Sequence, residues 1–173
     1  VWTPDKDVDV KLTNSGSTYT LTDSDDTVEV YTVTSGKGTL NSITKANGYA
    51  QTFNYTAGVL TSISDSYSRS LTFTYTSGVL TGVTTPDSAT LTYGYTTTAS
   101  QSLLTSITYN TSPSTSQTYV YANTELPFAL TSITDENANT NSQWTSDGTG
   151  GCTMTERAGG AAGERGAKCG STR

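Results

Sequence analysis

Three aspartates at alternate positions near the start of the chain are the first residues that could do chemistry. Asp5, Asp7 and Asp9 would share one face of a strand, and alternate carboxylates also occur in calcium loops. The segment lacks the glycine and the closing glutamate that such a loop needs. We therefore predict a solvated strand end and no metal site, although whether these three side chains bind a cation stays open.

A second acidic group has the composition of a turn. Asp23, Asp25 and Asp26 lie within four positions, and aspartate is common in turns because its side chain accepts hydrogen bonds from nearby backbone amides. A cation site is the alternative, but the turn explains the group without one.

Carboxylates farther along the chain raise the question of acid–base catalysis. A pair of carboxylates could hydrolyse a glycoside, but Asp65, Asp87 and Asp135 fall at equivalent turns of successive repeats. The chain has no histidine and no Gly-x-Ser-x-Gly segment that would present a nucleophilic serine. We predict that the protein is not an enzyme and that it has no catalytic residues and no cofactor.

One four-residue phrase recurs along the chain at intervals of about 20 to 26 residues, a spacing typical of a stacked repeat unit. Units of this size cannot bury an apolar face alone, so each depends on its neighbours. The copies are Leu40-Asn41-Ser42-Ile43, Leu60-Thr61-Ser62-Ile63, Leu80-Thr81-Gly82-Val83, Leu104-Thr105-Ser106-Ile107 and Leu130-Thr131-Ser132-Ile133.

The clearest unit runs over residues 60–76. Residues 60–64 alternate between apolar and polar, residues 65–68 form a turn, and residues 71–76 alternate again. Ser77-Gly78 then ends the second strand and returns the chain to Leu80. Repetition of this unit predicts an antiparallel meander of β-hairpins.

An aromatic pair accompanies each unit, as in Phe73-Thr74-Tyr75. We expect these rings to stack into a ladder when the strands pair. The ladder is either a repetitive core or a platform on which sugars stack. The candidate ligand-binding residues are Tyr55, Tyr75, Tyr95 and Tyr121.

Two further features suggest a binding surface. The aromatic pair and the next leucine are five positions apart in some repeats and nine in others, so we expect inserted loops, of which Thr97-Thr98-Ala99-Ser100 is typical. Alternating threonines such as Thr90-Leu91-Thr92 would form a grid of hydroxyls on the other face. Threonine is also simply a good outward strand residue.

Composition excludes several partners. Only 32% of the residues are hydrophobic and 14% charged, and the net charge is −6, which argues against nucleic acid and anionic membranes. No apolar run approaches the length of a membrane span, and no signal peptide is visible. Cys152 and Cys169 could form one local disulfide, but their redox state cannot be deduced.

The repeated unit resembles the YD repeat of bacterial Rhs proteins. The resemblance covers about residues 19–161, in an aromatic-x-Tyr strand, a glycine turn, the Leu-Thr-Ser-Ile phrase and a polar turn, with family-like phrases at Leu130-Thr131-Ser132-Ile133-Thr134-Asp135-Glu136-Asn137 and Glu156-Arg157-Ala158-Gly159-Gly160-Ala161. The family's Tyr-Asp is Tyr75-Thr76 here, and its Gly-Arg turn is Gly78-Val79. Family members use long arrays of this hairpin as shells around toxins or as surface modules. Nothing here resembles the family's self-cleavage motif or a toxin, so the resemblance implies the repeat fold alone.

We therefore expect an all-β fold of antiparallel hairpin repeats forming one curled, extended meander sheet. Residues 1–18 are an acidic lead-in strand, residues 19–155 are the YD-like array, and residues 156–173 are a disordered Gly/Ala-rich tail. The expected function is structural. The chain would be an extracellular or cell-surface scaffold, or a fragment of an Rhs-type shell, that joins copies of itself through sheet edges into oligomers or fibres. A glycan-binding adhesion module is the alternative.

Overall fold

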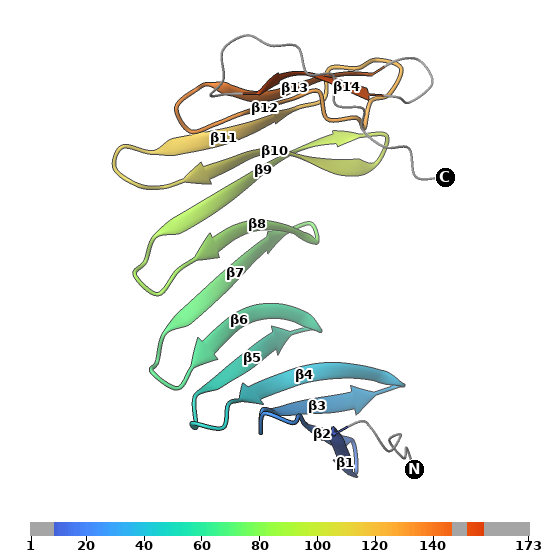
Figure 1. Ribbon diagram of the computed structural model, residues 1–173, viewed down its shortest axis with the longest axis vertical. Coiled ribbons are helices and arrows are strands. Elements are labelled where there is room, and N and C mark those ends of the chain that lie inside the picture. The colour runs from blue at the N-terminus through green and yellow to red at the C-terminus, as the bar shows by residue number, and fades with distance from the viewer. Residues whose placement is uncertain (1–8, 147–151, 158–173) are drawn as a thin grey trace. The chain divides into compact units, whose positions relative to one another are not determined.

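The computed structural model describes residues 9–146 and 152–157, and every regular element in that part of the chain is a β-strand (Figure 1). The early strands are β1 Lys11–Ser15, β2 Thr18–Thr22, β3 Val28–Thr34, β4 Lys37–Thr44, β5 Ala50–Thr56, β6 Val59–Asp65 and β7 Ser70–Thr76. The later strands are β8 Val79–Thr84, β9 Thr90–Thr98, β10 Gln101–Tyr109, β11 Thr115–Val120, β12 Ser132–Thr134, β13 Thr140–Ser146 and β14 Cys152–Arg157.

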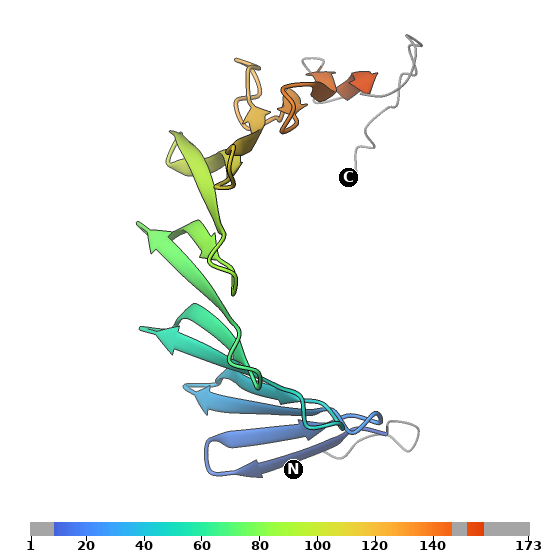
Figure 2. The same ribbon diagram turned by 90° about the vertical axis from the view of Figure 1, so that its left-hand side faces the viewer.

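The strands follow one another in the order of the sequence, from β1 to β14, and the paired strands run antiparallel. The predicted all-β meander is therefore confirmed. The chain divides into two units, residues 1–73 with 85–87 and residues 74–84 with 88–173. In the first unit, β1 to β6 form a single layer of strands (Figure 2). In the second unit, β8 pairs with β9 and the ladder continues to β14.

Two-residue turns close one end of the hairpins. Both central residues have positive φ in the turns of β3–β4, β5–β6 and β9–β10, as a type I′ turn requires. The same holds for Ser77 and Gly78, at φ 50° and 79°. Three of these four turns have glycine second, whereas Ala99-Ser100 places two residues with side chains in this region.

Five-residue turns close the other end, and four of them share one backbone pattern. In residues 65–69 the amide of Asp65 donates to the carbonyl of Arg69 (3.0 Å) and the amide of Ser68 donates to that of Asp65 (3.1 Å). The same two bonds occur in residues 23–27, 45–49 and 135–139. The fourth residue has positive φ in each of them, and also at Ser88 in the turn between β8 and β9.

The Leu-Thr-Ser-Ile phrase forms a β-bulge, which the sequence analysis missed. Asn54 pairs with Ser62 but Tyr55 pairs with Leu60, so Thr61 is an extra residue in β6. The bulge brings Leu60 and Ile63, three positions apart, onto the face that carries Phe53 and Tyr55. The reading of residues 60–64 as simple alternation is therefore wrong, because a regular strand would place Leu60 and Ile63 on opposite faces.

The hydroxyl of the extra residue binds the carbonyl that the bulge faces. Thr61 Oγ1 donates to the carbonyl of Asn54 (3.2 Å), and Thr81 Oγ1 donates to that of Thr74 (3.3 Å). Thr131 is bound most tightly, because both its amide (2.7 Å) and its hydroxyl (2.9 Å) donate to the carbonyl of Val120. Registers that skip Asn41 and Thr105 show the same bulge in β4 and β10.

Two of the three expected inserted loops are longer hairpins instead. In β3–β4 and β9–β10 the additional residues extend both strands, and a two-residue turn still joins them. Residues 121–131, between β11 and β12, do form a loop.

The expected domain limits also change. β1 lies in the lead-in segment and is one half of a hairpin with β2. Strand β14 continues to Arg157, beyond the predicted array limit at residue 155. The rest of the predicted tail, residues 158–173, lies outside the described residues. No helix in the described ranges is long and apolar enough to cross a bilayer.

Candidate functional site

Most leucine, isoleucine and aromatic side chains lie on one face of the strands, and most hydroxyls lie on the other. Strand β3 departs from this pattern, because Glu29 lies between Leu21 and Ile43. We call the face with the leucine, isoleucine and aromatic residues the apolar face. In the first unit one of its rows runs across β5, β6 and β7 through Phe53, Ile63 and Leu71. In the second unit a row crosses β9, β10 and β11 through Tyr93, Ile107 and Gln117. Because directly opposite residues in a sheet share a face, these rows form stripes that are apolar except at Gln117.

The opposite face carries hydroxyls, and we call it the hydroxyl face. In the first unit Thr52, Ser64 and Ser70 lie opposite one another on β5, β6 and β7. In the second unit Thr108 lies between Thr92 and Ser116. The separation predicted for residues 71–76 is confirmed, since Leu71 lies opposite Ile63 and Thr72 lies opposite Ser62. On strands β5 to β12 the only charged residue is Asp65, at the end of β6.

No described residue covers the apolar face. No hydrophobic side chain among the described residues is buried, and the only buried residue there is Thr27, 6% exposed. Most apolar residues are half-buried by their neighbours within the sheet, and Tyr55 and Tyr75 remain 37% exposed. The described strands thus form a layer without a core of its own.

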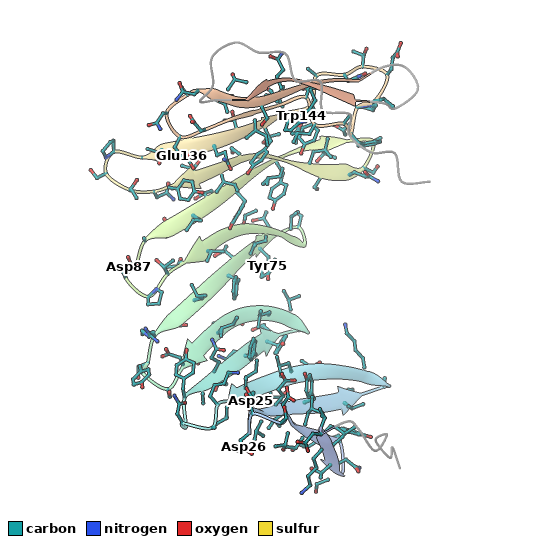
Figure 3. The ribbon with its side chains drawn as sticks, in the orientation of Figure 1. Asp25, Asp26, Tyr75, Asp87, Glu136 and Trp144 are labelled. Carbon is teal, nitrogen blue, oxygen red and sulfur yellow. The ribbon has the colours of Figure 1, made fainter. Side chains whose placement is uncertain are left out.

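Tyr55, Tyr75 and Tyr95 lie on the apolar face, and the four candidate tyrosines form no aromatic ladder. Tyr55 pairs with Leu60 and Tyr95 with Leu104, because strands that carry aromatic pairs alternate with strands that carry leucine and isoleucine. Tyr95 donates its hydroxyl to the carbonyl of Leu80 (2.8 Å). Tyr121 is half-buried just after β11, and Tyr75 lies near the end of β7 (Figure 3). The expectation of stacked rings is therefore wrong, and leucine or isoleucine separates the rings.

The stacked rings that the described residues do show belong to two turns of the first unit. Tyr49 and Tyr67 stack with ring centroids 6.0 Å apart, and the guanidinium of Arg69 lies 5.5 Å from the centre of the Tyr67 ring. Arg69 pairs with Asp65 through Nη2 (2.6 Å) and Nε (2.8 Å). Tyr67 is 71% exposed, so the cluster is a surface feature that fixes the turn. An Asp and an Arg four positions apart, in a stretch with little other charge, were the signal for it.

Asp65 is held ionised by this turn. Partial burial alone would raise the pKa of Asp65, but hydrogen bonds from the Arg69 guanidinium and from the amides of Arg69 and Tyr67 outweigh it, so the pKa is lowered. A carboxylate with a lowered pKa that accepts this many hydrogen bonds is poorly suited to act as a general acid.

Asp135 and Asp87 are also used by their own turns. Asp135 Oδ1 accepts the amides of Asn137 (3.0 Å) and Asn139 (2.9 Å), as Asp65 does in its turn. Asp87 lies at the turn between β8 and β9 (Figure 3) and accepts the hydroxyl of Thr85. The three aspartates do lie in equivalent turns, but Asp65 and Asp135 are first residues and Asp87 is third.

The acidic group near β2 likewise forms a turn. Asp25 accepts the amide of Thr27 (2.9 Å). Hydrogen bonding from the side chain of Thr27 and then from its amide, with a Lys45 ammonium 3.8 Å away, lowers the pKa of Asp25. Asp23 accepts the amide of Ser24 (2.7 Å). Figure 3 shows Asp25 and Asp26 beside this turn.

No metal-ligating cluster occurs among the described residues. Asp9 is exposed, and Asp5 and Asp7 lie outside the described range. The same is true of Cys169, and the side chain of Cys152 is not described either.

Comparison with known proteins adds no family to this picture. No family model matches the sequence, and no curated protein matches it. The resemblance to Rhs repeats therefore stays a prediction that rests on the repeated phrases.

Proposed function

We propose that this chain is a non-enzymatic structural repeat protein that joins copies of itself through the edges of its sheet. The role is that of an extracellular or cell-surface scaffold, or of a segment of an Rhs-type shell. One observation carries the proposal: each strand pairs only with its neighbours in sequence, and no described strand covers the outer edge of β1 or β14.

The edge of β1 has the chemistry for strand addition. Ser15 and Thr18 pair across a two-residue turn and so exchange hydrogen bonds, as does every second pair from there. The amides and carbonyls of Leu12 and Asn14 then point outward, away from β2. All five residues of β1 are exposed, so another strand can reach these groups.

The test is a single proline at that edge. In Leu12→Pro the outward N–H disappears while the bonds of Lys11, Thr13 and Ser15 to β2 are kept. Light scattering after size-exclusion chromatography should show concentration-dependent oligomers for the wild type and smaller species for this variant. Leu12→Ala is the matched control, because it shortens the same side chain and keeps the amide. A wild type that remains monomeric at high concentration would contradict the proposal.

A glycan-binding module is the second candidate, and one observation favours it. Tyr55 and Tyr75 keep 37% of their surface exposed and have ring faces to offer a sugar, whereas the Tyr95 hydroxyl is already bound to Leu80. A glycan array should then show saturable binding that Tyr75→Ala abolishes and Tyr95→Ala only weakens. Equal binding by the wild type and Tyr75→Ala would exclude this site.

A further inference from the structure

The apolar face of the second unit is an unused packing surface. A β-sheet with one apolar face is stable in water when a second layer covers that face. Leu91 lies between Val83 and Tyr109, and Ile107 lies opposite Tyr93, so apolar side chains occupy consecutive strands from β8 to β10. Tyr119 of β11 lies opposite Ile133 of β12 and continues this face. None of them is buried.

The composition of this face favours a contact that excludes water. No strand from β8 to β12 contributes a charge to it. Two of its hydroxyls have partners within the same sheet, since Tyr119 donates to Gln117 Oε1 (2.6 Å) and Tyr95 donates to the carbonyl of Leu80 (2.8 Å). Covering the face would therefore leave neither a charge nor these two hydroxyls buried without a partner. Buried polar groups without partners are what make burial costly.

We propose that the apolar face of the second unit packs against the same face of a second copy of this chain. A charged or strongly polar partner would leave its own groups unpaired against Val83, Leu91 and Ile107. A second copy brings an equally uncharged surface with the same rows of side chains. Two sheets that pack in this way interdigitate their side chains about 10 Å apart, as in a β-sandwich.

The area is sufficient for a specific contact. A residue on one face of a sheet covers roughly 33 Å², from a strand spacing of about 4.8 Å and about 6.8 Å between alternate residues. About a dozen residues on each copy thus remove on the order of 800 Å² of flat area from water, and the relief of the side chains brings this near the roughly 1,000 Å² of a biological interface. The equivalent face of the first unit carries Glu29 between Leu21 and Ile43, so it is not an uncharged surface of this kind.

This contact is independent of association through sheet edges. Edge pairing uses the backbone of β1, whereas face pairing uses side chains of β8 to β13. The two modes together would produce paired layers that also lengthen, and either mode can fail while the other persists.

Two neighbouring residues of β10 provide a matched test on the full chain. Ile107 lies on the apolar face, and Thr108 lies on the hydroxyl face of the same strand. Sedimentation velocity over a dilution series should show a dimer for wild type and for Thr108→Lys. Ile107→Lys should weaken the dimer at least a hundredfold. Leu12→Pro should leave the dimer intact and remove only larger species.

A second variant and a second signal protect the test against misfolding. Tyr93→Ser removes a ring from the row of Ile107 without adding charge, and it should weaken the dimer about tenfold while the far-ultraviolet circular dichroism stays unchanged. Trp144 lies on the same face, because Ser142, two positions before it, pairs with Ile133 (Figure 3). Its fluorescence should become more accessible to acrylamide on dilution of the wild type.

Three outcomes would overturn the proposal. The first is equal effects of the lysine at residues 107 and 108, and the second is loss of all association in Leu12→Pro. The third is a monomeric wild type. If Trp144 were shielded from acrylamide in that monomer, another part of the same chain would be covering the apolar face.

Discussion

The two ends of the hairpins solve the same problem with different chemistry. At the five-residue end, an acceptor side chain holds the backbone, and it can occupy the first position, as Asp65 and Asp135 do, or the third, as Asp25 and Asn47 do. At the two-residue end, backbone conformation alone closes the turn, and the following bulge is fixed by the threonine hydroxyl. One end tolerates many sequences, and the other repeats nearly the same phrase.

This difference shows where the register of the sheet is determined. A slip of one residue exchanges the apolar and hydroxyl faces of a strand. The five-residue turns keep the same length with different residues, so their composition varies without changing the faces. The Leu-Thr-Ser-Ile phrase contains the extra residue, and its spacing must be kept.

The largest effect is expected from changing that spacing. Insertion of a serine after Ser62 would make the bulge one residue longer and send Ile63 to the hydroxyl face. We expect a loss of about 3 kcal/mol or more in the free energy of unfolding, measured by urea denaturation.

Deletion of Thr61 is the opposite change and the control. It leaves Leu60 and Ile63 two positions apart, so a regular strand keeps both on the apolar face. The variant should fold with the same registers by hydrogen exchange. If deletion and insertion were equally harmful, the phrase would not act through the register.

At the five-residue end, Asp135→Ala should have the next largest effect. It leaves the amides of Asn137 and Asn139 without their acceptor, at a cost of about 1–3 kcal/mol in unfolding free energy. Asp135→Asn keeps an acceptor oxygen and should recover most of this loss in thermal denaturation. An unchanged melting temperature in the alanine variant would show that the turn backbone needs no side chain.

At the bulge, Thr131→Val tests the hydroxyl with nearly constant shape. The hydroxyl donates to the carbonyl of Val120 (2.9 Å) and accepts the amide of Ala122 (3.0 Å). Loss of both should cost about 1–2 kcal/mol, as measured by chemical denaturation. Thr131→Ser, which keeps the hydroxyl, should cost less. If the valine variant were as stable as the wild type, the backbone alone would stabilise the bulge.

A gain is expected at the least favourable two-residue turn. Ala99 and Ser100 have φ of 45° and 67°, where residues with a Cβ are strained. Replacement by Asn-Gly should raise stability by about 0.5–1 kcal/mol. The same replacement at Ser77-Gly78, which already has glycine second, should gain less, and an equal gain at both turns would argue against relief of strain at Ser100.

The smallest effect is expected from pH. Because the pKa of Asp65 is lowered in the folded chain, the unfolded chain takes up the proton more readily. The stability that this carboxylate contributes is present above its unfolded pKa of about 3.9 and is lost as pH falls through its folded pKa. Acid titration of the melting temperature should show a smaller fall in Asp65→Asn than in the wild type.

Much of the fold was predictable, because alternation and turn chemistry are local. The strands of residues 71–76, their apolar face of Leu71, Phe73 and Tyr75, and the turns at both ends follow from the sequence. The bulge was missed because a spacing of three, between Leu60 and Ile63, agrees with a strand only if one residue is extra, and no single copy of the phrase reveals which one. The prediction of an aromatic ladder was wrong because strand pairing places Ile63 beside Phe53. The repeated phrases alone do not determine which residues lie opposite one another.

The candidate site was less predictable for a different reason. Tyr55 and Tyr95 lie opposite Leu60 and Leu104, on the face of the leucines. Their separate environments depend on residues well separated along the chain, such as Leu80, 15 positions before Tyr95. The cluster of Tyr49 and Tyr67 was missed because it joins two turns that are 16 or more positions apart along the chain. A motif within one turn cannot predict such a contact.

Pairing that stays within neighbouring strands has an evolutionary consequence. No described strand pairs with any strand other than its neighbours in sequence. A gene could therefore gain or lose a segment that encodes one hairpin, and the remaining strands would still have pairing partners. Length in such a protein can change by duplication or loss of whole segments, while the identity of each face is inherited unchanged.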